Sequence, residues 1–118
     1  MKYLLLIYME ENAINQTDRE HCYVESAQLA RELHANGQFL STAPLHPVAM
    51  ATSVRVRDGK KLVTNGPFAE TREQLGGFFL IDAKDLDGAI SIAARIPGAR
   101  AGTVEIRPVI EVAGLPEN

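Results

Sequence analysis

The chain has 118 residues, of which 46% are hydrophobic and 23% charged, and its formal net charge at pH 7 is −3. This length predicts one domain with its own core, and the composition is close to the globular average, which argues against a disordered or membrane class. Nucleic-acid affinity comes mainly from clustered Lys and Arg, so the acidic balance argues against a nucleic-acid partner.

The N-terminal segment combines a lysine with a short apolar run, as a signal peptide does. The run is too short, however, and Glu10 and Glu11 follow where a cleavage site needs small residues. No stretch approaches a membrane span of about 20 apolar residues. Cys22 has no partner for an internal disulfide and no Cys or His neighbour at metal-ligand spacing. We therefore expect a cytoplasmic protein with no membrane partner and no required metal or nucleotide cofactor.

Residues 2–9 are predicted to form a strand whose two alternating faces are both apolar, which is typical of a sheet covered on both sides. After a polar loop, Thr17 and Glu20 have the spacing of a capping box, which predicts that a helix begins there. Gly37 predicts the end of this helix. Small and apolar residues fall along one stripe of it: Cys22, Ser26, Ala27, Leu29, Ala30 and Leu33.

Residues 39–47 are expected to be extended and partly exposed, because Pro44 and Pro47 disfavour a regular central strand. From residue 50 to residue 57 apolar and polar side chains alternate, which predicts a strand. The dipeptide Asp58-Gly59 then predicts a tight turn into a second short strand. Together these residues predict a β-hairpin.

The strand predicted over residues 77–82 is again apolar on both faces and is expected beside the first strand. Asp85 is placed to cap a second helix, which Pro97-Gly98 ends. A last strand over residues 102–112 sends Arg107 to the face opposite Val104 and Ile106. The apolar stripe expected on the second helix consists of Leu86, Ala89, Ile90, Ala93 and Ile96.

This order of elements predicts an α+β fold close to a ferredoxin-like βαββαβ with an extra hairpin, in which two helices cover one face of an antiparallel sheet. We expect a single domain over residues 1–112 and a C-terminal tail over 113–118. Because the first and fourth strands are also apolar on the face without helices, a monomer would expose a large apolar patch. The sequence therefore predicts a two-fold homodimer, a dimeric α+β barrel in which a second copy covers this face.

Three separated segments, residues 52–60, 65–81 and 104–109, resemble the YCII-related family and in particular its DGPF-motif branch. The resemblance covers nearly the whole chain and implies a fold similar to the dimeric α+β barrels. It also implies a small-molecule enzyme role of no established reaction, and a link of some members to extracytoplasmic-function sigma factors. Asn65 stands where the branch has aspartate, so no acid or base role carries over to this position.

The loop that begins at Asn65 contains most of the candidate site residues. Asn65, Gly66, Pro67 and Phe68 form either a simple turn or a ligand-binding loop at the mouth of the barrel. Glu70 belongs either to a solvated cluster of charges or to the site, where burial would suit its carboxylate to proton transfer. The sequence of residues 71–74 can also cap a short helical turn.

Two further candidates lie outside this loop. His46 stands between two prolines and is either a surface histidine or a general acid or base, since imidazole titrates near neutrality. Arg107 is expected to face the dimer interior, where it needs an anion. That anion is Glu105, a loop carboxylate or a bound ligand.

The leading hypothesis is a small enzyme-like dimer that binds a small polar or anionic metabolite and uses acid/base chemistry of an isomerase, lyase or hydrolase type. Arg107 would hold the anion, Asn65 and the Gly66-Pro67 backbone would orient it, and His46 or Glu70 would move a proton. The alternatives are a non-catalytic regulatory or binding module, linked to a sigma factor as in some relatives, and an interaction dimer without a ligand.

Overall fold

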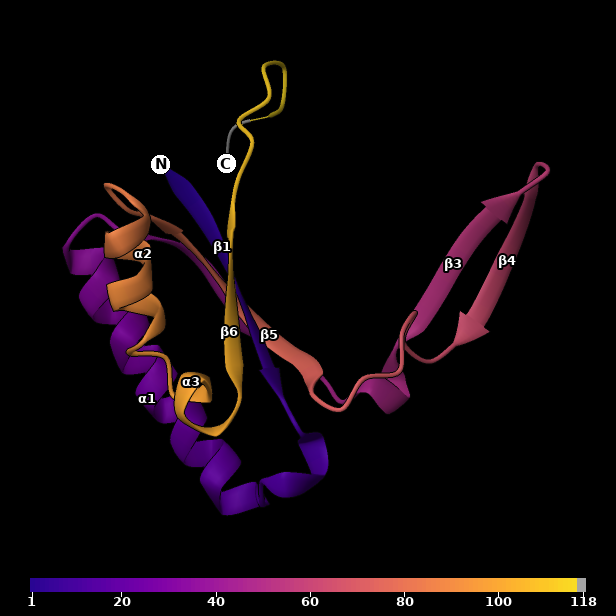
Figure 1. Cartoon of the computed structure of the whole chain (residues 1–118), viewed down its shortest axis with the longest axis horizontal. Helices are drawn as coiled ribbons and strands as arrows, with labels where there is room; N and C mark the ends of the chain where they lie inside the picture. Colours follow the sequence, from indigo (N-terminus) through magenta and orange to yellow (C-terminus); the bar gives the residue numbers. More distant parts are fainter. Residues whose placement is uncertain (117–118) are drawn as a thin grey trace.

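A four-stranded antiparallel sheet forms the centre of the computed structural model, which describes residues 1–116. The strands lie in the order β2 (Phe39–Pro44), β5 (Gln74–Asp82), β1 (Lys2–Met9) and β6 (Thr103–Pro108). Helices α1 (Gln16–Ala35), α2 (Leu86–Ala93) and α3 (Gly98–Ala101) lie together on one side of the sheet (Figure 1). This arrangement confirms the predicted ferredoxin-like α+β fold. Residues 117 and 118, the end of the predicted tail, lie outside the described range.

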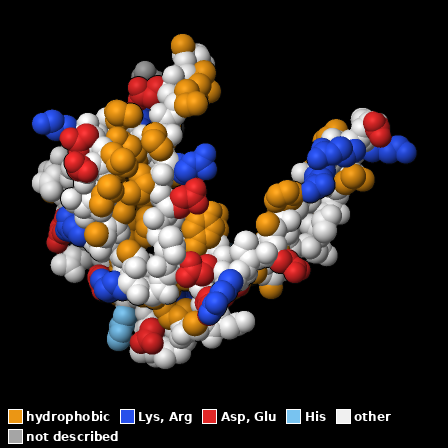
Figure 2. All heavy atoms as spheres, in the orientation of Figure 1, with side chains coloured by type: hydrophobic (Ala, Val, Ile, Leu, Met, Phe, Trp, Pro, Cys, Tyr) orange, Lys and Arg blue, Asp and Glu red, His pale blue; other side chains and the backbone are white. Residues whose placement is uncertain are grey.

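The predicted hairpin is an insertion between β2 and β5. Strands β3 (Thr52–Arg57) and β4 (Lys60–Asn65) form a separate two-stranded sheet, which we call the arm, and it extends away from the helices and the main sheet (Figure 1). Asp58 and Gly59 have φ values of 51° and 73°, as the tight turn at its tip requires. The radius of gyration is 16.0 Å, against about 13–14 Å for a compact chain of this length. Hydrophobic and basic side chains both lie along the arm (Figure 2).

The core lies between the sheet and the helices. Alternate residues of β1 and β5 point toward the helices, as the pairing of Leu5 with Phe79 and of Tyr3 with Ile81 shows. They are buried against Leu29 and Leu33 of α1 and against the following residues of α2 and its C-terminal turn: Ala89, Ile92, Ala93 and Ile96. Within residues 1–116, no helix combines the length and apolar character needed to cross a membrane.

The opposite face of the sheet carries a second set of large apolar side chains, which no helix covers. Its residues on β1 and β5 are half-buried and pair directly, Leu4 with Leu80 and Leu6 with Phe78. Arg107 of β6 pairs with Leu4 and so belongs to the same face. We call this surface the open face of the sheet.

Several local predictions were wrong. Helix α1 begins one residue before Thr17, and its N-cap is Asn15, whose side chain accepts a hydrogen bond of 2.8 Å from the Asp18 amide. Residues 71–74 form no helical turn, because Gln74 already belongs to β5. Leu86 and Ile90 were expected in the apolar stripe of α2, but their exposed fractions are 51% and 48%.

The segment around Pro44 is also more regular than predicted. Residues 39–44 form the edge strand β2, and Pro44 is its last residue, where a missing amide hydrogen bond costs little. Gly77 packs against this edge, since a Cβ on it would lie 3.0 Å from the Ala43 carbonyl oxygen. The close approach of the two strands at this point explains why glycine occupies position 77.

Candidate functional site

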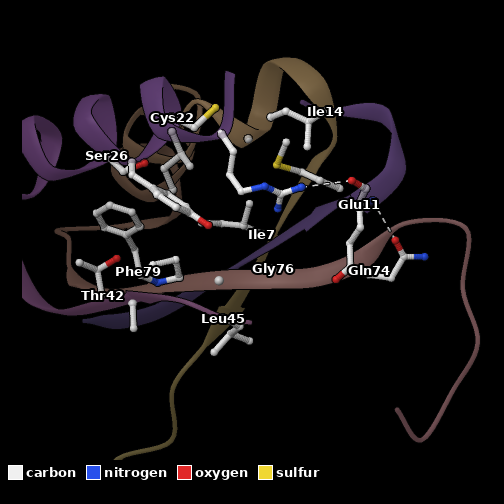
Figure 3. A pocket seen from close by; sticks show the side chains of 18 of the residues that line it. Ile7, Glu11, Ile14, Cys22, Ser26, Thr42, Leu45, Gln74, Gly76 and Phe79 are labelled. Carbon is white, nitrogen blue, oxygen red and sulfur yellow. Dashed lines mark hydrogen bonds between the residues drawn. The ribbon is translucent and has the colours of Figure 1, made fainter. Parts of the chain in front are cut away.

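A cavity of about 320 Å³ lies between the first half of α1 and one end of the sheet. Its volume is at the lower end of the range of small-molecule sites. Cys22 and Ser26 of α1 form one wall, and Thr42, Gly76 and Phe79 of the sheet face them (Figure 3). Most of the lining is apolar and includes Ile7, Met9, Ile14, Leu45 and Ile96.

Small residues on both walls explain why this space is empty. The C-terminal turns of α1 place Leu29 and Leu33 against the sheet, whereas the turns before them present Cys22, Ser26 and Ala27. On the sheet side, Gly76 and Gly77 provide no side chains. Gly76 is the extra residue of a β-bulge, because Ile7 pairs with Gly77 and Tyr8 with Leu75. The helix and the sheet therefore leave a gap that larger side chains would fill.

A network of hydrogen bonds closes one end of the cavity. The Glu11 amide, in the short 3-10 helix η1 (Glu11–Ala13), donates to Oε1 of Gln74 at 3.0 Å (Figure 3). The Glu11 carboxylate accepts a bond of 3.0 Å from the amide of Val48, in a second 3-10 helix, η2 (Val48–Met50). Glu11 thus connects the end of β1 to the segment that leads into the arm.

Arg19 is the cationic residue of the cavity lining. It lies in the first turns of α1, is half-buried, and donates from Nη2 to the carbonyl oxygen of Glu11 at 3.2 Å. Among the described residues, no carboxylate lies within 4.0 Å of its guanidinium, whereas Arg72, Arg95 and Arg100 each form an ion pair. The cavity therefore combines apolar walls with a cation at its polar end.

Cys22 contributes a half-buried thiol to the same cavity. Burial raises the pKa of this thiol, and the nearby Glu25 carboxylate adds to the effect. A thiol is a weak nucleophile while it is protonated, so at neutral pH Cys22 acts as a small apolar side chain. Within residues 1–116 no three His, Cys, Asp or Glu side chains come close enough together to hold a metal ion.

Two of the residues proposed from the sequence lie together in a different hollow. His46 and Pro67 line a space of about 350 Å³ between the η2 segment and the loop that follows the arm. The other lining residues are Leu45, Pro47, Val48, Met50, Ala51 and Leu75. Val48 links this hollow to the main cavity through its bond to Glu11.

Asn65, Gly66 and Phe68 lie at the base of the arm. Gly66 has a φ of 105°, its amide donates to the Ala51 carbonyl oxygen at 2.7 Å, and its own carbonyl oxygen accepts from Ser53 Oγ at 2.8 Å. These bonds hold the two ends of the arm together. The guanidinium of Arg55 lies over the exposed ring of Phe68, with its Cζ 5.0 Å from the ring centroid.

Glu70 and Arg107 lie apart from these residues. Glu70 is exposed in the loop before β5, where the neighbouring Arg72 pairs with Glu10 at 2.6 Å. Arg107 lies on β6 and forms an ion pair of 3.4 Å with Glu105, which is one of the partners considered for it from the sequence. Within one chain, the structure therefore brings His46 and Pro67 together and leaves Glu70 and Arg107 separate.

Three residues at the polar end of the cavity were not predicted from the sequence as site residues: Glu11, Arg19 and Gln74. Their roles depend on contacts between segments up to 63 residues apart, such as that of Glu11 with Gln74. A signal was nevertheless present, since small residues occur on one face of a helix and again as a Gly-Gly pair in a strand. When such a helix and strand pack together, a cavity between them is a natural result.

Comparison with known proteins agrees with this architecture. The family model of the YCII-related domain matches residues 1–113. The chain is also 35% identical over 118 residues to an uncharacterized protein of Rhizobium meliloti (strain 1021), a match that covers 92% of each chain. The match to the family model spans the sheet, the helices, the arm and the cavity. The chain therefore belongs to the YCII-related domain family.

Proposed function

We propose that the protein is a cytoplasmic homodimer that binds a small metabolite and carries out an acid/base step of an isomerase, lyase or hydrolase type. The observation that carries the proposal is the cavity of about 320 Å³ under α1. Apolar walls with a few polar groups at one end are the usual construction of a small-molecule site. The cavity is built by well-defined contacts of η1, α1 and β5, which favours a binding site that exists before the ligand arrives.

A metabolite-library thermal-shift screen tests this proposal. A ligand at a concentration of about 100 times its Kd stabilises the folded state by about 2.7 kcal/mol, which raises Tm by several degrees. The same screen is run on Ser26→Phe, which fills the cavity, and on Ser91→Phe, which places the ring on the exposed surface of α2. Stabilisation of the wild type and Ser91→Phe, but not of Ser26→Phe, is expected. Equal Tm shifts in all three proteins would show that the ligand does not bind in this cavity.

For the chemical step, His46 and Glu70 remain the proposed proton-transfer residues. Arg107 and the loop residues remain the proposed ligand contacts: Asn65, Gly66, Pro67 and Phe68. None of these residues lines the cavity under α1, so separate alanine variants of His46, Glu70 and Arg107 test whether the site extends to them: each is expected to reduce the thermal shift produced by a ligand from the screen while staying folded. A residue whose replacement leaves the shift unchanged is not part of the site. Asn65→Asp, measured alongside, tests whether an acid at this position changes the response.

A non-catalytic binding module is the second candidate function. It is favoured by the separation of His46, Glu70 and Arg107, which line no common cavity in the part of one chain that the structure describes. Incubating the protein with its ligand and following the ligand by NMR separates the two candidates. Turnover supports the enzyme, and unchanged ligand after prolonged incubation supports the binding module.

Two surfaces support the homodimer. The open face of the sheet carries Leu4, Leu6, Phe78 and Leu80, which no helix of the same chain covers. The arm exposes further apolar side chains on its strands: Val54, Val56, Leu62 and Val63. A two-stranded hairpin is marginally stable by itself, so the arm gains most from packing against another surface.

The charges favour a second copy of this chain as that surface. The arm contains Arg55, Arg57, Lys60 and Lys61 but a single acid, Asp58, which gives it a charge of +3. Since the whole chain has a charge of −3, the residues outside the arm carry −6. The arm of one copy is therefore complementary in charge to the body of another, and such complementarity favours association.

A further inference from the structure

We infer that the cavity under α1 takes an apolar monocarboxylate of about ten to twelve non-hydrogen atoms, whose carboxylate is bound by Arg19. This inference rests on the proposed function, because it names the class of ligand for the same cavity. It places the anion-binding residue on α1, whereas the sequence alone suggested Arg107.

The Arg19 guanidinium has donors that are free to bind a ligand. A guanidinium has five N–H donors, and the structure describes one hydrogen bond for this one, to the Glu11 carbonyl oxygen. Arg19 is half-buried and, among residues 1–116, has no carboxylate within 4.0 Å. A partly desolvated cation is stabilised by an anion, so an anionic group of the ligand is the matching partner.

Three other polar side chains of the lining already have partners. The Gln74 amide accepts from Glu11 and donates to the Thr71 carbonyl oxygen at 2.6 Å. The hydroxyl of Thr42 donates to the Phe78 carbonyl oxygen at 2.8 Å, and the Glu11 carboxylate accepts from Val48. The hydroxyls of Ser26 and Tyr23 also face the cavity but are neutral, so Arg19 is the charged group with donors to spare for a ligand.

The presence of Glu11 limits the charge that the ligand can carry. Its carboxylate lines the same cavity, so a dianion such as a phosphate monoester would be attracted by Arg19 and repelled by Glu11. A carboxylate has a single negative charge and two oxygens that fit the planar fork of a guanidinium. A monocarboxylate therefore fits this pair of residues better than a phosphate does.

The walls and the volume define the rest of the ligand. Ile7, Ile14, Phe79 and Ile96 surround the space with apolar surface. Its volume of about 320 Å³ equals that of about ten water molecules, each with a share of about 30 Å³ in the liquid. An aromatic or branched aliphatic body with one carboxylate arm satisfies both limits.

The test compares 3-phenylpropionate with its neutral amide, 3-phenylpropanamide, and with 3-phenylpropylamine, by isothermal titration calorimetry on the full chain. The acid is expected to bind wild type at least tenfold more tightly than the amide or the amine. In Arg19→Gln, affinity for the acid should fall to the level of the amide, while affinity for the amide stays the same and reports an intact cavity. The matched control is Arg31→Gln, which changes an exposed arginine of the same helix and should leave all three affinities unchanged.

Different results separate this inference from the proposed function. Equal binding of the acid and the amide, lost for both in Ser26→Phe, would overturn the carboxylate assignment and support the cavity as a site. Tighter binding of the amine would assign the polar end to Glu11 and overturn the inference. Failure of all three compounds to bind wild type would also overturn it, while the proposed function would still be decided by the library screen.

Discussion

Val54 and Val63 face each other directly across the two strands of the arm, and both are more than half exposed, by 59% and 57%. A directly opposed pair of valines stabilises a hairpin, yet most of the surface of this pair remains in water. Its burial against a second molecule would add about 25 cal/mol for each Å² removed from water. The pair is therefore the best place at which to test the role of the arm.

We predict that Val54→Glu weakens the homodimer. A carboxylate at this position would have to be desolvated on association, so the variant should elute as a monomer at micromolar concentration, whereas wild type elutes as a dimer. Size-exclusion chromatography with light scattering measures this directly. Val24→Glu, at a position of α1 that is 67% exposed, is the control and should remain dimeric. A monomeric wild type would rule out the homodimer.

The second prediction concerns the close packing of α3 on β1. A Cβ on Gly102 would overlap the carbonyl oxygen of Tyr8, a main-chain atom that cannot move alone. Gly102→Ala should therefore lower the free energy of unfolding by about 1–3 kcal/mol, the usual cost of overpacking. In Gly88→Ala, within α2, the new Cβ by contrast has Asp85 Oδ1 and Ala83 Cβ as its nearest atoms, at 3.5 Å and 3.6 Å. That variant should gain about 0.5–1 kcal/mol from higher helix propensity.

Urea denaturation of both glycine variants measures these changes. A loss of stability in Gly88→Ala as large as that in Gly102→Ala would contradict this prediction, because the contact with Tyr8 would then not be what distinguishes the two positions.

The third prediction concerns the pH dependence of Cys22. Because burial raises the pKa of this thiol, the folded protein binds the thiol proton more tightly than the unfolded chain does. The resulting stabilisation is complete below the pKa of the unfolded thiol and is lost as the pH rises through that of the folded thiol. The rate of alkylation by iodoacetamide should accordingly rise at higher pH in the native protein than in the protein unfolded in guanidinium chloride.

The same reaction reports occupancy of the cavity. A ligand that fills the space beside Cys22 should slow its alkylation in wild type. Coincident pH profiles for the folded and unfolded protein would contradict the burial of the thiol.

The fourth prediction concerns the bond that joins the cavity to the base of the arm. Glu11→Ala removes the acceptor of the Val48 amide, so hydrogen exchange at that amide should accelerate by about tenfold, the equivalent of about 1.4 kcal/mol. Glu10→Ala is the control, because Glu10 pairs with Arg72 at the exposed surface and does not bond to η2. Unchanged exchange in Glu11→Ala would show that the η2 segment is held by other contacts.

Much of the fold was predictable because its signals are local. The Asp58-Gly59 turn forms as expected, Asp85 caps α2 with a bond of 2.9 Å to the Gly88 amide, and Gly37 ends α1 with a φ of 72°. The predicted N-cap of α1 was wrong because Asn15 and Thr17 are both suitable capping residues, and a pattern of residue types does not decide between them. Because of Pro44, no regular strand was predicted over residues 39–44. Proline disfavours a strand only where its missing amide would have to bond to a neighbouring strand, and β2 is an edge strand that ends at Pro44.

The candidate site was less predictable, because it forms where distant segments meet. Arg19 looks like any surface arginine of a helix until η1 places the Glu11 carbonyl oxygen beside it. Gly76 and Ser26 are separated by 50 positions in the sequence. Because both are small, a cavity remains between them where α1 packs across β5. The residue types on each wall were visible in the sequence, but no cavity was predicted from them, because the geometry of packing decides what the two walls enclose.

Strands β2 and β5 are antiparallel neighbours, so a short turn would suffice to join them, yet residues 45–73 leave the body between them and return. This segment is therefore a module: it can change in length, charge or shape without altering the order of the sheet or the packing of the helices. In the proposed homodimer, its change would alter how copies of the protein recognise one another. Evolution and protein engineering thus have a position in the fold at which the proposed assembly can be revised separately from folding.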